Sequence, residues 1–281
     1  MRGVRSAAVL VAAALTVGCG KSDAADAPAT PTAGVIHGKV TGADGKPIGA
    51  LVKDIAIVIS GVSEAAEKVS YTPAVKADGT YKQKVSPGQY VFNPATITVT
   101  YNDAEFRLPL EPVGGNWNKN QDAADGIVQD FVWKPTGATP YGASNGKDPG
   151  NATHWYGLNV GIAFDGYRDD IGKVPVVIPD KSKLTFTLKP AGKAIDGSEP
   201  KPLTLERTYD SKSYTSLDLN DLLPAPYELT GTVTPPDGTT KPLLLQGKGD
   251  YPGYKSSVKI TVEQDNILGR MWKQPVQFVM E

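Results

Sequence analysis

Residues 76–92 read KADGTYKQKVSPGQYVF and hold the features that decide the fold. Asp78-Gly79 is a strong turn pair, because glycine adopts positive φ freely and aspartate hydrogen-bonds its own turn. The run Tyr81–Val85 alternates with period two, Pro87-Gly88 turns the chain again, and Tyr90–Phe92 resumes the alternation. Alternating runs between turn pairs predict short antiparallel strands.

The same pattern extends on both sides of this stretch. It recurs in VIHGKVTGADGKPIGA (Val35–Ala50), with its own Asp44-Gly45 turn, in DIAIVISG (Asp54–Gly61) and in TITVTYNDAEFRLPLEPV (Thr96–Val113). About seven short strands, with turns every eight to twelve residues, predict a small antiparallel β-sandwich over residues 35–113.

Four segments within this range, GKVTGADGKPI, IVISG, ADGTYKQKV and PGQYVF, resemble in order and spacing the carboxypeptidase-regulatory-like domains. The resemblance implies a transthyretin-like (prealbumin-like) sandwich. It also implies a non-catalytic accessory role, since such modules serve many secreted proteins. Fold likeness of this kind does not carry a function.

Residues 114–281 continue in the same style, and Gly114-Gly115 is the expected module boundary. KLTFTLKP (residues 183–190) alternates strictly, and Asp196-Gly197 and Asp237-Gly238 supply further turns. LLPAPYEL at Leu222–Leu229 also repeats the Pro and Tyr spacing of VSPGQYVF at Val85–Phe92. We therefore predict a second β-sandwich over 114–281, and an all-β protein of two sandwich modules.

The first 19 residues have the pattern of an export signal. Arg2 and Arg5 precede the apolar run Ala7–Leu15, which is too short for a permanent membrane span. The stretch resembles a bacterial lipoprotein signal ending at Cys19, with Thr16 in a position where such signals usually carry Leu. That resemblance implies removal of residues 1–18 and a diacylated Cys19; an ordinary signal peptide with an incidental cysteine is the alternative.

Residues 19–34 are small, polar and rich in Pro and Ala, which is typical of a flexible linker. Removing residues 1–18 would take two of the 29 basic residues and none of the 30 acidic ones, so the net charge would change from −1 to −3. The charges are dispersed, so nucleic acid is not an expected partner. The expected partners are the membrane, through acylated Cys19, and an envelope protein or glycan.

GASNG (residues 142–146) matches the G-x-S-x-G motif of serine hydrolases. Ser144 would be the nucleophile and His154 its base, with Asp165, Asp169 or Asp170 to orient the histidine. No strand precedes the motif and no helix follows it in the sequence pattern, so a surface loop is the favoured interpretation.

DGYRDD gives Asp165, Asp169 and Asp170 as the best calcium candidates, because carboxylate-rich turns between strands can hold that ion. A solvated charged turn is the simpler expectation, and no other cofactor is predicted.

Aromatic residues concentrate between Gly114 and Gly157. Trp133 has strand register and is expected in a core. The remaining candidates lie among Asn, Asp and Gly, where exposed rings would suit the apolar faces of a sugar. They are Trp117, Tyr141, Trp155 and Tyr156. The alternative is that these rings fold back and cap the sandwich.

Together these features predict a lipid-anchored protein of the cell envelope, in the outer membrane if the cell has two membranes. Its expected role is non-catalytic binding or scaffolding through β-sandwich modules. Glycan binding by loop aromatics is the alternative, and serine hydrolysis is a remote one.

Overall fold

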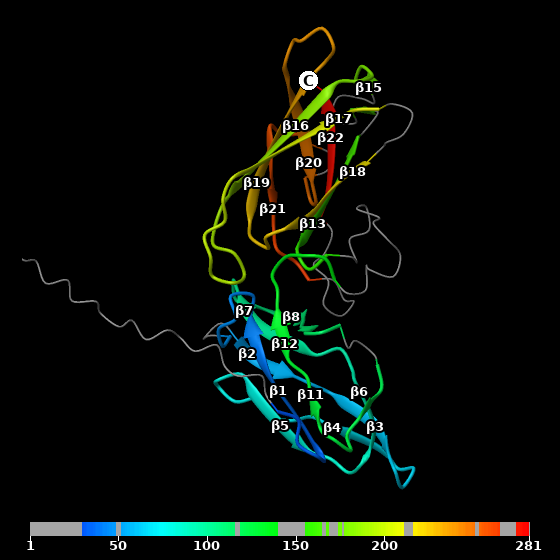
Figure 1. Cartoon of the computed structure of the whole chain (residues 1–281). Helices are drawn as coiled ribbons and strands as arrows, with labels where there is room; N and C mark the ends of the chain where they lie inside the picture. The colour runs from blue at the N-terminus through cyan, green and yellow to red at the C-terminus, as the bar shows by residue number, and fades with distance from the viewer. Residues whose placement is uncertain are drawn as a thin grey trace, which may run out of the picture. The chain divides into compact units, whose positions relative to one another are not determined.

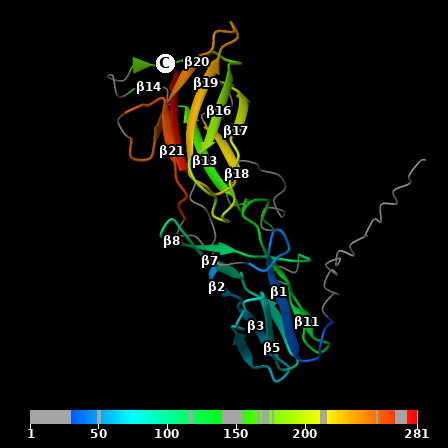
Figure 2. The same ribbon diagram turned by 90° about the vertical axis from the view of Figure 1, so that its left-hand side faces the viewer.

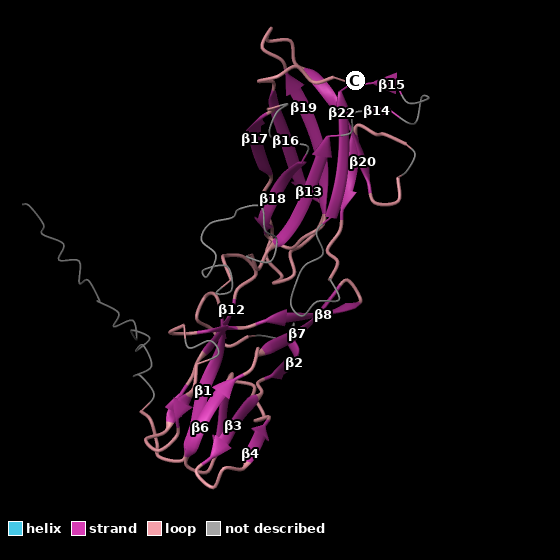
Figure 3. Ribbon diagram, turned by 90° about the vertical axis from the view of Figure 1, so that its right-hand side faces the viewer, coloured by secondary structure: helices cyan, strands magenta, loops and turns pink. Residues whose placement is uncertain are grey.

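The computed structural model describes residues 30–48, 52–115, 119–139, 155–164, 167–168, 174–175, 177–210, 216–250, 253–264 and 274–280. Within these ranges every regular element is a β-strand, and the ribbon shows no helix (Figure 3). The all-β prediction is therefore confirmed. The strands form two β-sandwich modules, described in turn below.

The N-terminal module contains twelve strands in three sheets (Figure 1). The first sheet has the order β11-β1-β12-β9 with β5 paired to β1, the second has the order β10-β6-β3-β4, and the third is β2-β7-β8. The strands are β1 (Val35–Gly42), β2 (Val52–Ala56), β3 (Ile59–Ser63), β4 (Lys68–Tyr71), β5 (Thr80–Lys84), β6 (Gly88–Phe92), β7 (Thr96–Tyr101), β8 (Ala104–Pro109), β9 (Glu111–Pro112), β10 (Gln121–Asp122), β11 (Ile127–Val128) and β12 (Phe131–Trp133).

The last three of these strands lie beyond the boundary expected at Gly114-Gly115. β10 pairs with β6, and β11 and β12 both run parallel to β1, with Ile36 opposite Ile127 and Val40 opposite Phe131. By strand pairing, the N-terminal module therefore continues to Trp133. Alternation of polar and apolar residues indicates a strand but not the strand with which it pairs. The pairing of β10, β11 and β12 with the N-terminal strands could therefore not be predicted from the sequence.

Gly38 permits the switch from β11 to β12 along β1. A Cβ at this position would lie 1.9 Å from the carbonyl oxygen of Gln129, the residue that follows β11. The Lys39 amide then donates to Oδ1 of Asp130 (2.7 Å). Glycine inside a strand here marks a close approach of two backbones.

The C-terminal module is a second sandwich. One layer has the order β17-β16-β19 with β21 on β19, the other has the order β20-β22-β13-β18, and β19 also pairs with β20 (Figure 2). β13 and β22 are parallel, β14 and β15 form a separate pair, and the other pairings are antiparallel. The strands are β13 (Leu158–Phe164), β14 (Tyr167–Arg168), β15 (Val174–Pro175), β16 (Lys183–Pro190), β17 (Leu203–Thr208), β18 (Ser216–Leu222), β19 (Tyr227–Thr234), β20 (Lys241–Gly247), β21 (Ser257–Ile260) and β22 (Gln274–Met280).

The alternating side chains fill the cores as expected. Leu184, Phe186 and Leu188 on β16 are fully buried. Phe186 meets Phe278 of the opposite layer edge to face, with ring centroids 5.8 Å apart. The edge-to-face geometry stabilises the packing beyond the area that it buries.

The predicted Asp-Gly turns are all present. In each one, the aspartate Oδ1 accepts from the amide two residues on, and the glycine has φ between 75° and 86°. These turns are Asp44-Gly45, Asp78-Gly79, Asp196-Gly197 and Asp237-Gly238.

The repeat seen in the sequence has a structural counterpart. The Tyr90 hydroxyl donates to the Ser86 carbonyl (2.8 Å), and the Tyr227 hydroxyl donates to the Leu223 carbonyl (2.8 Å). In both modules a tyrosine in a strand, Tyr90 of β6 or Tyr227 of β19, is thus hydrogen-bonded to the residue four positions earlier. The shared Pro and Tyr spacing therefore reflects the same local hydrogen bond in both modules.

Candidate functional site

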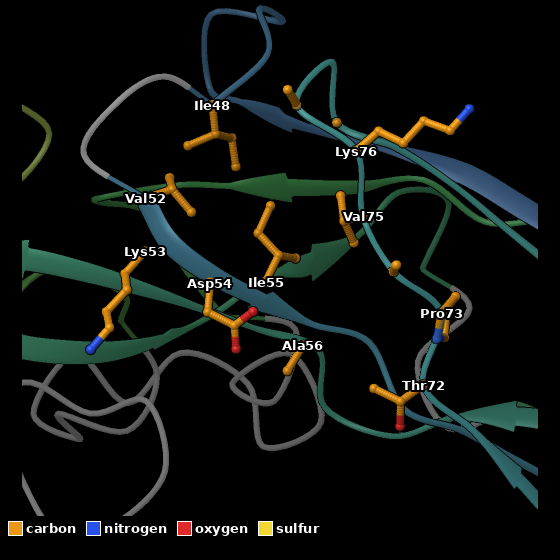
Figure 4. Close-up of a pocket in the computed structure, with 13 residues that line it drawn as sticks. Ile48, Val52, Lys53, Asp54, Ile55, Ala56, Thr72, Pro73, Val75 and Lys76 are labelled. Carbon is orange, nitrogen blue, oxygen red and sulfur yellow. The ribbon is translucent and has the colours of Figure 1, made fainter.

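A groove of about 720 Å³ lies beside β2 in the N-terminal module (Figure 4). One wall is β2, and the other is the segment Thr72–Lys76 between β4 and β5. Ile48, Val52, Ile55 and Val75 are half-buried, pack against the core and gather around the groove (Figure 4). Since burying this aliphatic surface would be favourable, the groove is suited to binding a partner.

β2 forms the open edge of its sheet. Among the strands that the structure describes, it pairs only with β7, and the pairing shifts register between Val52 and Asp54. This shift is a β-bulge with Lys53 as the extra residue. On its other side, β2 faces the groove with no paired strand among the described residues.

The charges on β2 are arranged asymmetrically. The Lys53 ammonium donates to Oε1 of Glu105 on β8, which lies beyond β7, so Lys53 points away from the groove (Figure 4). Asp54 is exposed and forms no ion pair with any residue that the structure describes. Among the described residues, the groove therefore carries one unpaired negative charge on β2, Asp54, and one unpaired positive charge on the opposite wall, Lys76.

The opposite wall is tied to β5. Val75 forms an isolated antiparallel bridge with Tyr81, and the Lys76 amide donates to the Thr80 carbonyl (2.9 Å). The Thr80 hydroxyl (2.7 Å) and amide (2.9 Å) both donate to Asp78, which lowers the pKa of that carboxyl. This turn holds the second wall in place against the first sheet.

Sequence reasoning missed the groove. The charged pair Lys53-Asp54 inside an otherwise apolar run was the available signal, because charges within a strand are typical of sheet edges. The second wall comes from a segment after β4, and nothing in the local sequence places it opposite β2.

The aromatic prediction can be checked at three residues. Trp133 is buried, as expected for a core residue, and Tyr156 is also buried, with 6% of its surface exposed. Tyr156 is therefore poorly placed to stack on a sugar. Trp155 is half-buried and forms an isolated antiparallel bridge with Ala138. Its indole Nε1 is buried without a hydrogen-bond partner among the described residues.

Asp221 forms hydrogen bonds with Gly137 and Gly157, which lie next to the bridge between Ala138 and Trp155. Its Oδ1 accepts from the amides of Gly137 (2.7 Å) and Gly157 (3.2 Å), and its own amide contacts Oδ1 of Asn159 (3.4 Å). It adopts φ of 62°, which aspartate tolerates better than most residues. Burial raises the pKa of this carboxyl, although the two amides act in the opposite direction. Sequence reasoning gave Asp221 no role, because its partners lie more than sixty residues away.

A smaller hollow of about 280 Å³ separates β17 from β18, the two edge strands of the C-terminal sandwich. Leu203 and Leu205 line it from β17, and Leu219 and Leu222 line it from β18. Leu203 is 39% exposed, so this seam between the layers is only partly closed.

The other predicted site residues lie outside the described residues. They are Cys19, Trp117, Tyr141, Ser144, His154, Asp165, Asp169 and Asp170. Among the residues that are described, no three His, Cys, Asp or Glu side chains cluster as metal ligands would. In the same ranges no helix has the length and hydrophobicity needed to span a bilayer.

Comparison with known proteins gives only remote likenesses. No family model matches the chain, and no curated protein matches it. Among solved structures it is similar to the Bacillus anthracis TIE protein, with 12% identity, a TM-score of 0.35, and coverage of 88% of this chain and 34% of that one. It is also similar to a C-terminal fragment of the pilus adhesin SpaC from Lactobacillus rhamnosus GG (11% identity, TM-score 0.26, coverage 88% and 97%). A DUF3823 family protein from Bacteroides ovatus ATCC 8483 is a third (12% identity, TM-score 0.21, coverage 83% and 100%).

The chain spans only part of the longer proteins that it resembles. It covers 34% of the TIE chain, 24% of a leucine-rich repeat protein from Bacteroides thetaiotaomicron and 31% of SpaC in an open conformation. With TM-scores below 0.5, these likenesses say nothing about what this chain binds.

Proposed function

We propose that this chain is an exported protein, anchored through lipid on Cys19, that works at the cell envelope by binding rather than by catalysis. The apolar run Ala7–Leu15 followed by Cys19 supports the anchor. Two acyl chains hold a protein stably on a membrane, whereas one holds it weakly. In a cell with two membranes, the outer membrane is the proposed location.

The observation that carries the binding role is the groove beside β2. It combines half-buried aliphatic side chains, a volume of about 720 Å³ and an unpaired strand edge in one place. A contiguous exposed apolar surface bordered by polar residues is typical of an interaction site.

The test is site-specific photo-crosslinking in intact cells. A benzoylphenylalanine placed at Ala56, which lines the groove, is expected to cross-link to a discrete envelope component. The same residue placed at Asp125, which is exposed and does not line the groove, serves as the control. Equal labelling from both positions would contradict a binding role for the groove.

Glycan binding is a second candidate because Trp155 is half-buried, which leaves part of its ring exposed for stacking on a sugar. This candidate predicts that Trp155→Ala weakens the affinity for envelope polysaccharide, measured by isothermal calorimetry. An unchanged affinity would remove Trp155 from the site.

A further inference from the structure

We infer that the groove beside β2 accepts an extended peptide segment of a partner protein, which adds to the open edge of β2 as a further strand. The inference rests on the proposed binding function and specifies its ligand. The ligand is apolar at alternate positions and carries a Lys or Arg opposite Asp54.

The backbone of β2 provides the first argument. An edge strand presents a row of amide and carbonyl groups that only another extended backbone can satisfy along its length. All five residues of β2 line the groove, so the groove runs along the edge and not over one face of the sheet. Five residues of strand span about 17 Å at roughly 3.3 Å per residue.

The placement of Lys53 provides the second argument. A lysine on an edge strand normally deters pairing, because a new strand would desolvate its charge. Here the ammonium is bound by Glu105 on the far side of β7 and is directed away from the groove (Figure 4). The Lys53 charge is therefore held on the β7 side of β2 and not beside its open edge.

The apolar walls and Asp54 define the ligand. A strand beside β2 would place alternate side chains between Ile55 and Val75, where both walls are half-buried. Asp54 is exposed and without an ion pair among the described residues, so a basic side chain directly opposite it would be favoured. Opposite charges across adjacent strands favour association, and like charges oppose it.

The test uses synthetic octapeptides of alternating Val and Thr with one central Lys or one central Glu, and fluorescence anisotropy on the detergent-solubilised full chain. We expect the Lys peptide to bind about fivefold more tightly than the Glu peptide. Asp54→Lys is expected to reverse this preference, whereas Asp125→Lys, at an exposed site outside the groove, should leave it unchanged.

N-methylated peptides test the strand geometry without altering the protein. Methylating every second amide removes half of the backbone donors and leaves the side chains in place. Strand addition predicts that one of the two alternate sets lowers affinity at least tenfold and the other does not. Three results would each overturn the inference. These are equal binding of the two N-methylated sets, a preference for the Lys peptide that Asp54→Lys does not change, and no binding of any peptide.

The cross-linking experiment separates this inference from the proposed function. A groove-specific cross-link combined with failure of the peptides would leave the binding function standing and reject strand addition. Failure of both would reject both.

Discussion

At the scale of single residues, the fold depends on a few backbone contacts that tolerate no extra atom. Gly38 is the strictest of these, since any Cβ would overlap the Gln129 carbonyl at 1.9 Å. Gly61 is similar, because a Cβ there would lie 2.4 Å from the Tyr90 ring. In both places the nearest atoms belong to a neighbouring segment that pairs with the strand carrying the glycine.

Gly38→Ala is expected to lower the free energy of unfolding by about 3 kcal/mol, because β11 and β12 would have to move away from β1. Gly253→Ala is the control, since its Cβ would meet the nearest atom at 3.4 Å. Urea unfolding measures both. Equal stability of the two variants would contradict the close approach described for Gly38.

Asp221 allows a prediction about hydrogen bonding. Asp221→Gly removes the acceptor for the Gly137 and Gly157 amides and is expected to cost about 2 kcal/mol. Asp221→Asn keeps an acceptor oxygen and tolerates the positive φ, so it should be much less destabilising. Urea unfolding of the two variants at neutral pH gives the comparison. Equal losses of unfolding free energy would show that the two hydrogen bonds do not contribute to stability.

The same residue predicts a pH dependence. Burial raises the pKa of Asp221 above its usual value of 3.8, so the folded protein holds this proton more tightly than the unfolded chain does. Its contribution to stability is therefore greatest below pH 3.8 and is lost as the pH rises through the folded pKa. The stability of the wild type relative to Asp221→Asn should fall over this window and stay constant above it. A relative stability that rises with pH would show that the carboxyl is instead stabilised in its charged form.

At the scale of elements, local patterns predicted strands and turns but not their partners. The alternation of Leu184, Phe186 and Leu188 and the Asp-Gly pairs are local properties, and the structure confirms both. The parallel pairing of β11 and β12 with β1 joins residues about ninety positions apart. The groove depends on the same kind of long-range pairing. Whether β2 is an edge strand depends on which other strands pair with it, and the local sequence does not determine that.

The candidate site was predictable only in part for the same reason. Aromatic residues clustered in the sequence, but Tyr156 is buried and Trp155 half-buried once the chain is folded. The role of Asp221 could be recognised only in the structure, where the Gly137 and Gly157 amides donate to its carboxylate. Sequence spacing carries no such information.

Tyr90 in β6 and Tyr227 in β19 lead to a prediction for each module. Tyr90→Phe and Tyr227→Phe remove one hydroxyl each and keep the ring, so each should cost about 1 kcal/mol. Tyr81→Phe should cost more, because the Tyr81 hydroxyl is buried and donates to the Gln129 carbonyl at 2.5 Å. Thermal unfolding followed by circular dichroism gives the order of the three variants. A Tyr81→Phe variant as stable as the other two would contradict the burial argument.

At the scale of the whole molecule, the proposed function depends on lipid attachment at Cys19. Cys19→Ala is expected to move the protein from the membrane fraction to the soluble fraction, because a cysteine is required for acylation. Fractionation followed by immunoblotting measures the change, and Ser6→Ala within the same leader is the control. A Cys19→Ala protein that stays in the membrane fraction would contradict lipid anchoring.

The central claim is that the open edge of β2 is the surface with which this protein binds its partner. Hydrogen–deuterium exchange of the full chain, with and without the Lys-bearing peptide, tests it most directly. The account predicts at least tenfold slower exchange in residues 52–56 on binding and no change in β17, an edge strand of the other sandwich. Unchanged exchange in residues 52–56, or equal protection of β17, would contradict it.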